Sequence, residues 1–490
     1  MEVIFASDKQ IAGVELMAYG YGNRDQQTFL PASIEEYVDK DAPVRAYDAF
    51  VEALDFSELG IELDDRKVGN SSYDPKAMLK LLVYGYAYGV RSSRKLERET
   101  HYNMSFIWLT GGLKPDHKTI AEFRCNNRTA LSRVLRQCAR LCLELDLVAG
   151  NTLFVDGSNI AANASLRHHW SKSRCRKRLQ KIDRRIEEIL SECERVDSEE
   201  AEVGSLVKLR EELADQQARR QKIEGILRQL RSSDKAWVNT TDPECVSTKG
   251  RQGFRAGYKM QSVVDEKHGL IVQADVVAES HDTNELRNQV KRAQETLGEV
   301  CETVCADSGY ANYDEMEKLE DEGIKVIVPS RRQANRQEPK PFEKSQFEYD
   351  REKDVYVCPA GKLMTYRGIE KGKRKIYRAG GSVCRQCCHF GRCTKAGKNG
   401  RKIVRYLNEE FRESMAAQYQ QPESQEIYKL RKEKAELPFA LIKWNLKAGH
   451  FLLRGLSKVK AEASLLASCF NLVRMINLLG VPKLTAKLLT

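Results

Sequence analysis

The chain has 490 residues and a formal net charge of +11, with 41% hydrophobic and 31% charged residues. This length allows a substantial core and roughly two to four domains. No run approaches the roughly 20 apolar residues of a membrane span, and the amino terminus has no basic region followed by an apolar one. The composition therefore excludes a membrane-embedded protein, and we expect a globular cytoplasmic one.

The sequence predicts a helical domain over residues 1–148. Helices are expected over 75–88, 94–102 and 117–128, and an amphipathic stretch continues to about residue 147. Each of the three starts after a residue suited to capping a helix. These residues are Asp74, Ser92 or Ser93, and Asp116.

The third of these helices carries candidate DNA contacts. Leu113, Ile120 and Phe123 are expected to pack inward. Polar side chains would then face a groove or phosphates, as in a helix-turn-helix domain. They are Lys118, Thr119, Arg124 and Arg128. A plain packing or dimerisation domain is the alternative.

Residues 149–330 predict a mixed sheet with an insertion. Strands are expected over 152–156, 258–265, 270–277, 303–307 and 324–328, with helices from Asp282 and over 313–322. Two antiparallel strands followed by alternating helices and strands indicate a mixed sheet covered by helices. His281 and Asp282 are expected to cap the first helix; an accessory metal or DNA contact is the alternative. The sheet domain would comprise 149–170 and 236–330.

The intervening residues 171–235 are highly charged and have apolar residues at helical spacing. A break near 197–204 would let them fold back as an antiparallel helical hairpin. Its expected role is structural or in contacts between subunits.

Residues 331–425 form a basic, cysteine-rich insertion. Between Arg331 and Arg405 there are 21 Lys and Arg residues against 7 Asp and Glu. Such a surface indicates a polyanion, most often nucleic acid; a solvated loop without a partner is the alternative.

Four of the five cysteines in this segment have the spacing C-x₂₅-C-x₂-C-x₅-C: Cys358, Cys384, Cys387 and Cys393. Four thiolates can bind one structural Zn²⁺, which would stabilise a segment expected to lack its own hydrophobic core. Reduced, unliganded thiols are the alternative.

Residues 426–490 complete the sheet domain. A helix is expected from Gln425 to about Leu446, and a packing helix over 456–479. One broad face of the first would carry an acid among cations and a tyrosine. These residues are Tyr428, Lys432, Glu436 and Lys443.

Three carboxylates stand at related positions in these elements. Asp156 and Asp307 each end a predicted strand, and Glu436 opens the helical stretch 436–443. Hard oxygen ligands from separate elements are what two Mg²⁺ (or Mn²⁺) ions need at a phosphodiester-cleaving site. An aspartate at a strand end is commonly a cap or turn former, so the interpretation rests on the order and context of all three carboxylates.

Several of these segments resemble the DDE transposases of bacterial insertion sequences. They are Phe154–Ser158, Ala306–Tyr310, the series Tyr428, Arg431, Glu436 and Lys443, the phrase Phe451–Glu462, and Asp116–Arg124. The resemblance is to the branch with a Tyr-Arg-Glu-Lys signature, of the insertion-sequence eleven-eighty-two type. One spacing departs from that branch: four residues rather than three separate Arg431 from Glu436, and Lys432 restores the count.

The resemblance implies an RNase H-like α/β catalytic domain with Asp156, Asp307 and Glu436 as its triad. It implies DNA contacts by Tyr428, Arg431 or Lys432, and Lys443. It also implies binding of terminal inverted repeats, strand cleavage and strand transfer by a homodimer or larger homo-oligomer, associated with the bacterial nucleoid when on DNA. Two alternatives remain: a DNA-binding protein without catalysis, and an RNase H-like nuclease that only cleaves.

Overall fold

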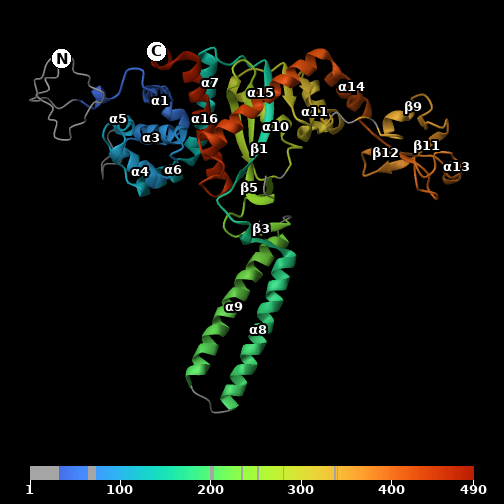
Figure 1. The fold of residues 1–490 in the computed structure, drawn as a ribbon, viewed down its shortest axis with the longest axis horizontal. Helices are drawn as coiled ribbons and strands as arrows, with labels where there is room; N and C mark the ends of the chain where they lie inside the picture. Colours follow the sequence, from blue (N-terminus) through green and yellow to red (C-terminus); the bar gives the residue numbers. More distant parts are fainter. Residues whose placement is uncertain are drawn as a thin grey trace, which may run out of the picture.

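The computed structural model describes residues 33–63, 73–198, 203–232, 236–250, 253–279, 281–335, 338 and 340–490. Figure 1 shows a body of helices around a central sheet, a long pair of helices that projects from this body, and a small β lobe beside it. The fold is mixed α/β, with helices packed on a mixed sheet.

Six strands form the central sheet. They are β1 (Thr152–Ala161), β4 (Val246–Gly250), β5 (Gly253–Asp265), β6 (Ile271–Val277), β7 (Thr303–Ala306) and β8 (Lys325–Ile327). β1 is antiparallel to β5 on one side and parallel to β7 on the other, and β8 is parallel to β7. β4 and β6 pair with β5 in antiparallel fashion. The mixed sheet predicted from the order of strands and helices is confirmed.

Parallel neighbours need crossover connections, and two helices supply them here. α10 (Leu286–Leu297) precedes β7, and α11 (Tyr313–Asp321) joins β7 to β8. α14 (Glu409–Gln420) packs beside β8 and α11, and α15 (Pro422–Trp444) packs against β1, β5 and β7.

α16 (Leu456–Leu479) lies in the middle of the core. It packs against β6, α3 (Pro75–Ala87) and α7 (Arg128–Glu144), and α17 (Val481–Leu488) follows it. Of the helices in the described part of the chain, α16 alone has the length and composition of a membrane span. This corrects the expectation that no segment approaches one. Because 67% of that stretch is buried inside the protein, core packing accounts for its apolar character.

The amino-terminal region is helical as predicted in its described residues, 33–63 and 73–148; residues 1–32 and 64–72 of the predicted domain lie outside them. Besides α3 and α7 it contains η1 (Ile34–Tyr37), α1 (Pro43–Glu52), α2 (Phe56–Leu59), α4 (Ser93–Tyr102), α5 (Met104–Leu109) and α6 (His117–Asn126). Asp74 accepts hydrogen bonds from the first backbone amides of α3, and Asp116 does the same for α6. Ser92 precedes α4 but makes no such side-chain bond.

The projecting pair consists of α8 (Lys172–Ser198) and α9 (Val203–Ser232), packed along each other (Figure 1). The short strands β2 (His169–Ser171) and β3 (Trp237–Asn239), with η2 (Leu166–His168) before them, pair at its base. Its apolar cluster lies near the base: Cys175, Ile182, Ile223, Ile226, Leu227, Leu230 and Val238. The break expected near 197–204 lies partly outside the described residues.

The basic, cysteine-rich segment forms the β lobe. Its sheet contains β9 (Glu348–Asp350), β10 (Val355–Val357), β11 (Leu363–Glu370), β12 (Arg374–Arg378) and β13 (Lys402–Tyr406). Each strand pairs in antiparallel fashion with the next one in the chain. The short helices of this segment are α12 (Arg331–Ala334), η4 (Lys344–Gln346) and α13 (Gly381–Arg385). Another short helix, η3 (Ser308–Tyr310), follows β7 in the central domain.

This lobe has its own small core, contrary to the prediction. Buried side chains from several strands meet there: Phe347, Tyr356, Met364, Tyr377, Ala379, Cys384 and Ile403. The rings of Tyr356 and Tyr377 lie edge to face, with centroids 5.1 Å apart. The prediction failed because a few large aromatic residues, spread over separate strands, supply the apolar surface that composition alone did not reveal.

Candidate active site

The pairing of β1 with β7 brings Asp156 and Asp307 to neighbouring positions. Val155 of β1 is in register with Ala306 of β7, and the two strands are parallel. Asp156 directly follows Val155 and Asp307 directly follows Ala306, so the two aspartates are neighbours. Asp307 follows β7 directly, as predicted. Asp156 does not end its strand, because β1 continues to Ala161 through antiparallel pairing with β5.

Glu436 reaches the same place from α15. It lies in the second half of this long helix rather than at a helix start, which corrects that expectation. Pro438 lies inside α15 and is buried. The helix contacts β1, β5 and β7, and this packing carries Glu436 toward the two aspartates.

All three carboxylates contact the guanidinium of Arg431. Its Nη2 lies 3.3 Å from Asp156 Oδ1 and 3.8 Å from Asp307 Oδ2, and its Nη1 lies 3.9 Å from Glu436 Oε1. The Arg431 side chain is buried, and its Nε atom has no hydrogen-bond partner. Three acids from separate elements thus surround one positive charge.

The pKa values follow from this arrangement. Burial raises the pKa of Asp156 to about 6, against the opposing effect of Arg431. Burial alone would lower the pKa of Arg431, but the carboxylates of Asp156 and Asp307 raise it above its usual value. The electrostatics therefore favour a cation among these carboxylates.

A second polar network adjoins the aspartates. Asp282 is ion-paired with Lys259 and accepts a hydrogen bond from Gln261 Nε2 at 2.7 Å. Gln261 Oε1 accepts from the Tyr310 hydroxyl. Asp282 does not cap α10, whose N-cap is Glu285, so the cap expectation is wrong. Sequence reasoning missed this network, because its contacts cross from β5 to two loops.

Two glycines make room for these side chains. A Cβ atom at Gly157 would lie 2.8 Å from both Gln261 Oε1 and the Tyr310 hydroxyl oxygen. A Cβ at Gly309 would lie 2.8 Å from Asp307 Oδ1. Glycine at both positions thus keeps the carboxylates and the network close together.

The other predicted residues of α15 spread around the site. Lys443 donates a hydrogen bond to Ser158 Oγ, two residues beyond Asp156 on β1. Tyr428 is half-buried, and its ring lies 5.9 Å from the Arg431 guanidinium carbon. Lys432 is exposed. Arg431 therefore faces the carboxylates, whereas its neighbour Lys432 faces solvent.

Of the candidate DNA contacts on α6, one is exposed and one is buried. Lys118 is exposed. Arg124 is buried, and its Nη1 donates to the carbonyl oxygen of Arg91 at 2.9 Å, so it cannot face a groove as predicted. Leu113 is exposed rather than packed inward, while Ile120 is buried.

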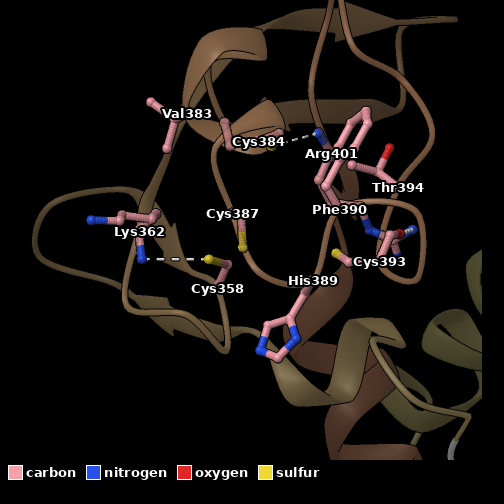
Figure 2. Close-up of a pocket in the computed structure, with 11 residues that line it drawn as sticks. Cys358, Lys362, Val383, Cys384, Cys387, His389, Phe390, Cys393, Thr394 and Arg401 are labelled. Carbon is pink, nitrogen blue, oxygen red and sulfur yellow. Dashed lines mark hydrogen bonds between the residues drawn. The ribbon is translucent and has the colours of Figure 1, made fainter.

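The four predicted zinc ligands line one small pocket of the β lobe (Figure 2). Cys358 Sγ accepts a hydrogen bond from the Lys362 backbone N–H at 3.4 Å, and Cys384 Sγ accepts from that of Arg401 at 3.4 Å. Burial raises the pKa of Cys393, and the three other cysteines raise it further. The spacing thus does gather Cys358, Cys384, Cys387 and Cys393.

Neither cluster has the geometry of a formed metal site. Within the described residues, no three His, Cys, Asp or Glu side chains are close enough to hold a metal ion as placed. At the carboxylates the donor set itself suits a hard divalent cation. There, the position that all three acids approach is taken by the Arg431 guanidinium.

Two family models match the chain. Residues 32–126 match a family described as Transposase domain (DUF772), and residues 357–476 match one described as Transposase DDE domain. The second match includes Glu436 and the cysteine pocket but not Asp156 or Asp307.

Comparison with curated proteins finds no match. Among solved structures, a piggyBac transposase synaptic complex with hairpin DNA is similar at a TM-score of 0.33 and 9% identity, over 92% of this chain and 79% of that one. A similarity this low does not show a shared fold or a shared function. The two family matches, in separate parts of the chain, support a DDE transposase.

Proposed function

We propose that this protein is a DNA transposase that binds the terminal inverted repeats of an insertion sequence, cleaves DNA and joins the freed end to a target. The observation that carries the proposal is the meeting of Asp156, Asp307 and Glu436 around one cationic group. The two transposase matches and the mixed sheet support it. We assign the sheet domain to the RNase H-like class on the same grounds.

Asp156, Asp307 and Glu436 would hold two Mg²⁺ or Mn²⁺ ions. When bound, these ions activate a water or 3′-hydroxyl nucleophile and stabilise the leaving 3′-oxygen. The chain's own residues neutralise and orient the substrate: Lys443 and Lys432 would contact phosphates, and Tyr428 a terminal phosphate or base. Where such ions were bound, Arg431 would release the carboxylates and could contact a phosphate oxygen.

DNA is the proposed partner, with repeat recognition assigned to the amino-terminal helical domain. Lys118 is exposed there and remains a candidate contact. Two DNA ends must be held together for transposition, which requires at least two subunits. The hairpin of α8 and α9 is the proposed contact, because it projects from the body (Figure 1).

A strand-transfer assay tests the function and separates it from its rivals. The full chain is mixed with Mg²⁺, a supercoiled plasmid and a labelled duplex that carries the DNA flanking the gene. The proposal predicts label joined covalently to the plasmid. Cleaved but never joined duplex would favour a nuclease that only cleaves, and specific binding without cleavage would favour a non-catalytic DNA-binding protein.

Replacing Arg431 should make stability depend on divalent metal. In Arg431→Ala, three carboxylates lose their shared cation. We therefore expect the free energy of unfolding in EDTA to fall by about 2–4 kcal/mol. The loss should stay below the largest values for broken buried pairs, because Asp307 and Glu436 are partly exposed to solvent. Mg²⁺ should raise the melting temperature of the variant more than that of the wild type, because it no longer competes with the guanidinium.

Thermal unfolding with Mg²⁺ and with EDTA measures this difference. Lys429→Ala, an exposed change on the same helix, is the control and should respond to Mg²⁺ like the wild type. An equal Mg²⁺ response in Arg431→Ala would argue against a cation site at these carboxylates.

We also propose that Cys358, Cys384, Cys387 and Cys393 bind a structural Zn²⁺. Their gathering around one pocket and the backbone N–H groups directed at two of the sulfurs support this proposal. The thiolates would have to close around the ion, since the sulfurs as placed do not form a metal site. The small aromatic core of the lobe reduces how much folding free energy the metal must supply.

Metal analysis of the purified full chain decides this question. We expect about one zinc ion per chain, lost when Cys384→Ser and Cys387→Ser are combined. Cys388→Ser is the control, because the exposed Cys388 lies outside the set and should leave zinc in place. Wild-type protein free of zinc would refute the site.

A further inference from the structure

A groove of about 1000 Å³ opens beside the carboxylates. Its lining includes Gly157, Ser158 and Asn159, which directly follow Asp156 on β1. Other lining residues come from β4 and β5 and from the end of α15 around Lys443 and Trp444. The groove therefore adjoins the proposed cleavage site.

The groove is positively charged. Four cationic side chains line it: Lys249, Arg255, Lys259 and Lys443. None of the described residues that line it is acidic, although Lys259 shares its charge with the adjacent Asp282. Such a lining attracts a polyanion, and glycines with open space beside them let a phosphate backbone come close. Two lining glycines have such space, Gly253 and Gly449.

Two large aromatic side chains of the groove are exposed. Phe254 on β5 is 69% exposed, and Trp444 at the end of α15 is 70% exposed. Aromatic side chains are enriched at binding interfaces, so two exposed rings that line one groove are candidates for contact with a ligand. In a basic groove, the partner that fits both features is a nucleotide strand, whose phosphates pair with the cations and whose bases stack on the rings.

We infer that this groove binds an unpaired stretch of the DNA strand next to the cleaved bond, with bases stacked on Phe254 and Trp444. Within a continuous duplex both faces of each base are covered by neighbouring bases, so along an uncut helix these rings can stack only on bases that have left it. The inference rests on the proposed function and adds to it the form of substrate that the site prefers: locally unpaired rather than continuous duplex DNA.

The test measures binding rather than catalysis. The full chain in EDTA is titrated into three labelled probes: the junction duplex, the same duplex with three unpaired bases at the junction, and one strand alone. The wild type should bind the probe with unpaired bases at least about tenfold more tightly than the duplex. Phe254→Ala or Trp444→Ala should weaken that binding by about 5- to 150-fold, the range for loss of one stacked base, with duplex affinity within about twofold of the wild type.

Two controls separate stacking from charge and from misfolding. Val300→Ala removes an apolar side chain that is also 69% exposed but lies outside the groove, and should change neither affinity. Lys249→Ala should weaken binding of all probes alike and reduce the salt dependence by about one phosphate contact.

The inference is wrong if the wild type binds all probes equally, or if both aromatic variants keep the preference. Failure of the proposed function is a separate result: strand transfer would be absent while the preference for unpaired bases persists. Conversely, intact strand transfer without any such preference would overturn only this inference.

Discussion

Asp307→Ala should reduce metal-dependent strand cleavage by about a thousandfold or more, with DNA affinity within a few fold of the wild type. The size follows from loss of one of three carboxylates proposed to hold the metal ions, since groups that act as a unit fail together. Stability should change little, because the Asp307 side chain is 42% exposed and its hydrogen bond is to the Gly309 backbone. Cleavage rates and binding curves for the same protein preparation measure both quantities.

Asp321→Ala is the matched control for this variant. Asp321 is an exposed aspartate at the end of α11, away from the three carboxylates, and its loss should leave cleavage unchanged. If Asp307→Ala also lost most of its DNA affinity, or cleaved as well as the control, Asp307 would have a structural role instead.

Glu462→Ala should cost about 3–5 kcal/mol of unfolding free energy, the range for a broken buried ion pair. Glu462 is fully buried on α16; its Oε1 lies 2.9 Å from Arg91 Nη1. It also accepts hydrogen bonds from the backbone N–H groups of Leu452 and Leu453 at 3.0 Å. The variant leaves the buried Arg91 cation without its carboxylate counter-ion and two backbone amides without their acceptor.

The same contact joins distant parts of the chain. Arg91 lies in the amino-terminal helical region and also donates to the carbonyl oxygens of Lys447 and His450. Its guanidinium thus ties that region to the loop between α15 and α16, and loss of Glu462 should weaken the connection between the two regions.

Urea unfolding of the full chain measures this cost. The control is Glu423→Ala, which removes a mostly exposed partner of Lys325 and should change stability by less than about 1 kcal/mol. Equal unfolding midpoints for the two variants would contradict the assignment of Glu462 as a buried anchor.

Local signals made much of the fold predictable. α16 spans Leu456–Leu479, the range expected from its apolar spacing, and Asp74 and Asp116 cap α3 and α6 as predicted. The second half of β1 was not predicted, because Gly157, Ser158 and Asn159 have no apolar alternation. Their strand geometry comes from pairing with β5, a contact about one hundred residues away in sequence.

The candidate site was predictable to a similar depth. Residues at matching positions of neighbouring parallel strands are brought together by the sheet, so the closeness of Asp156 and Asp307 follows from strand order and register. The central position of Arg431 and the approach of Asp282 depend on side-chain packing between elements, which spacing does not encode. For the same reason, Arg124 seemed a surface cation although it is buried under Tyr86 and Arg91.

The central claim is that Asp156, Asp307 and Glu436 form a metal-dependent strand-cleaving site. Its most direct test is cleavage of an end-labelled duplex that spans the junction between the flanking DNA and the element. The full-length wild type is incubated with this duplex in Mg²⁺ and in EDTA, and the position of any nick is mapped. The account predicts a nick at the junction in Mg²⁺ and none in EDTA. Tight binding at the junction by well-folded protein, without a nick in Mg²⁺ or Mn²⁺, would contradict it.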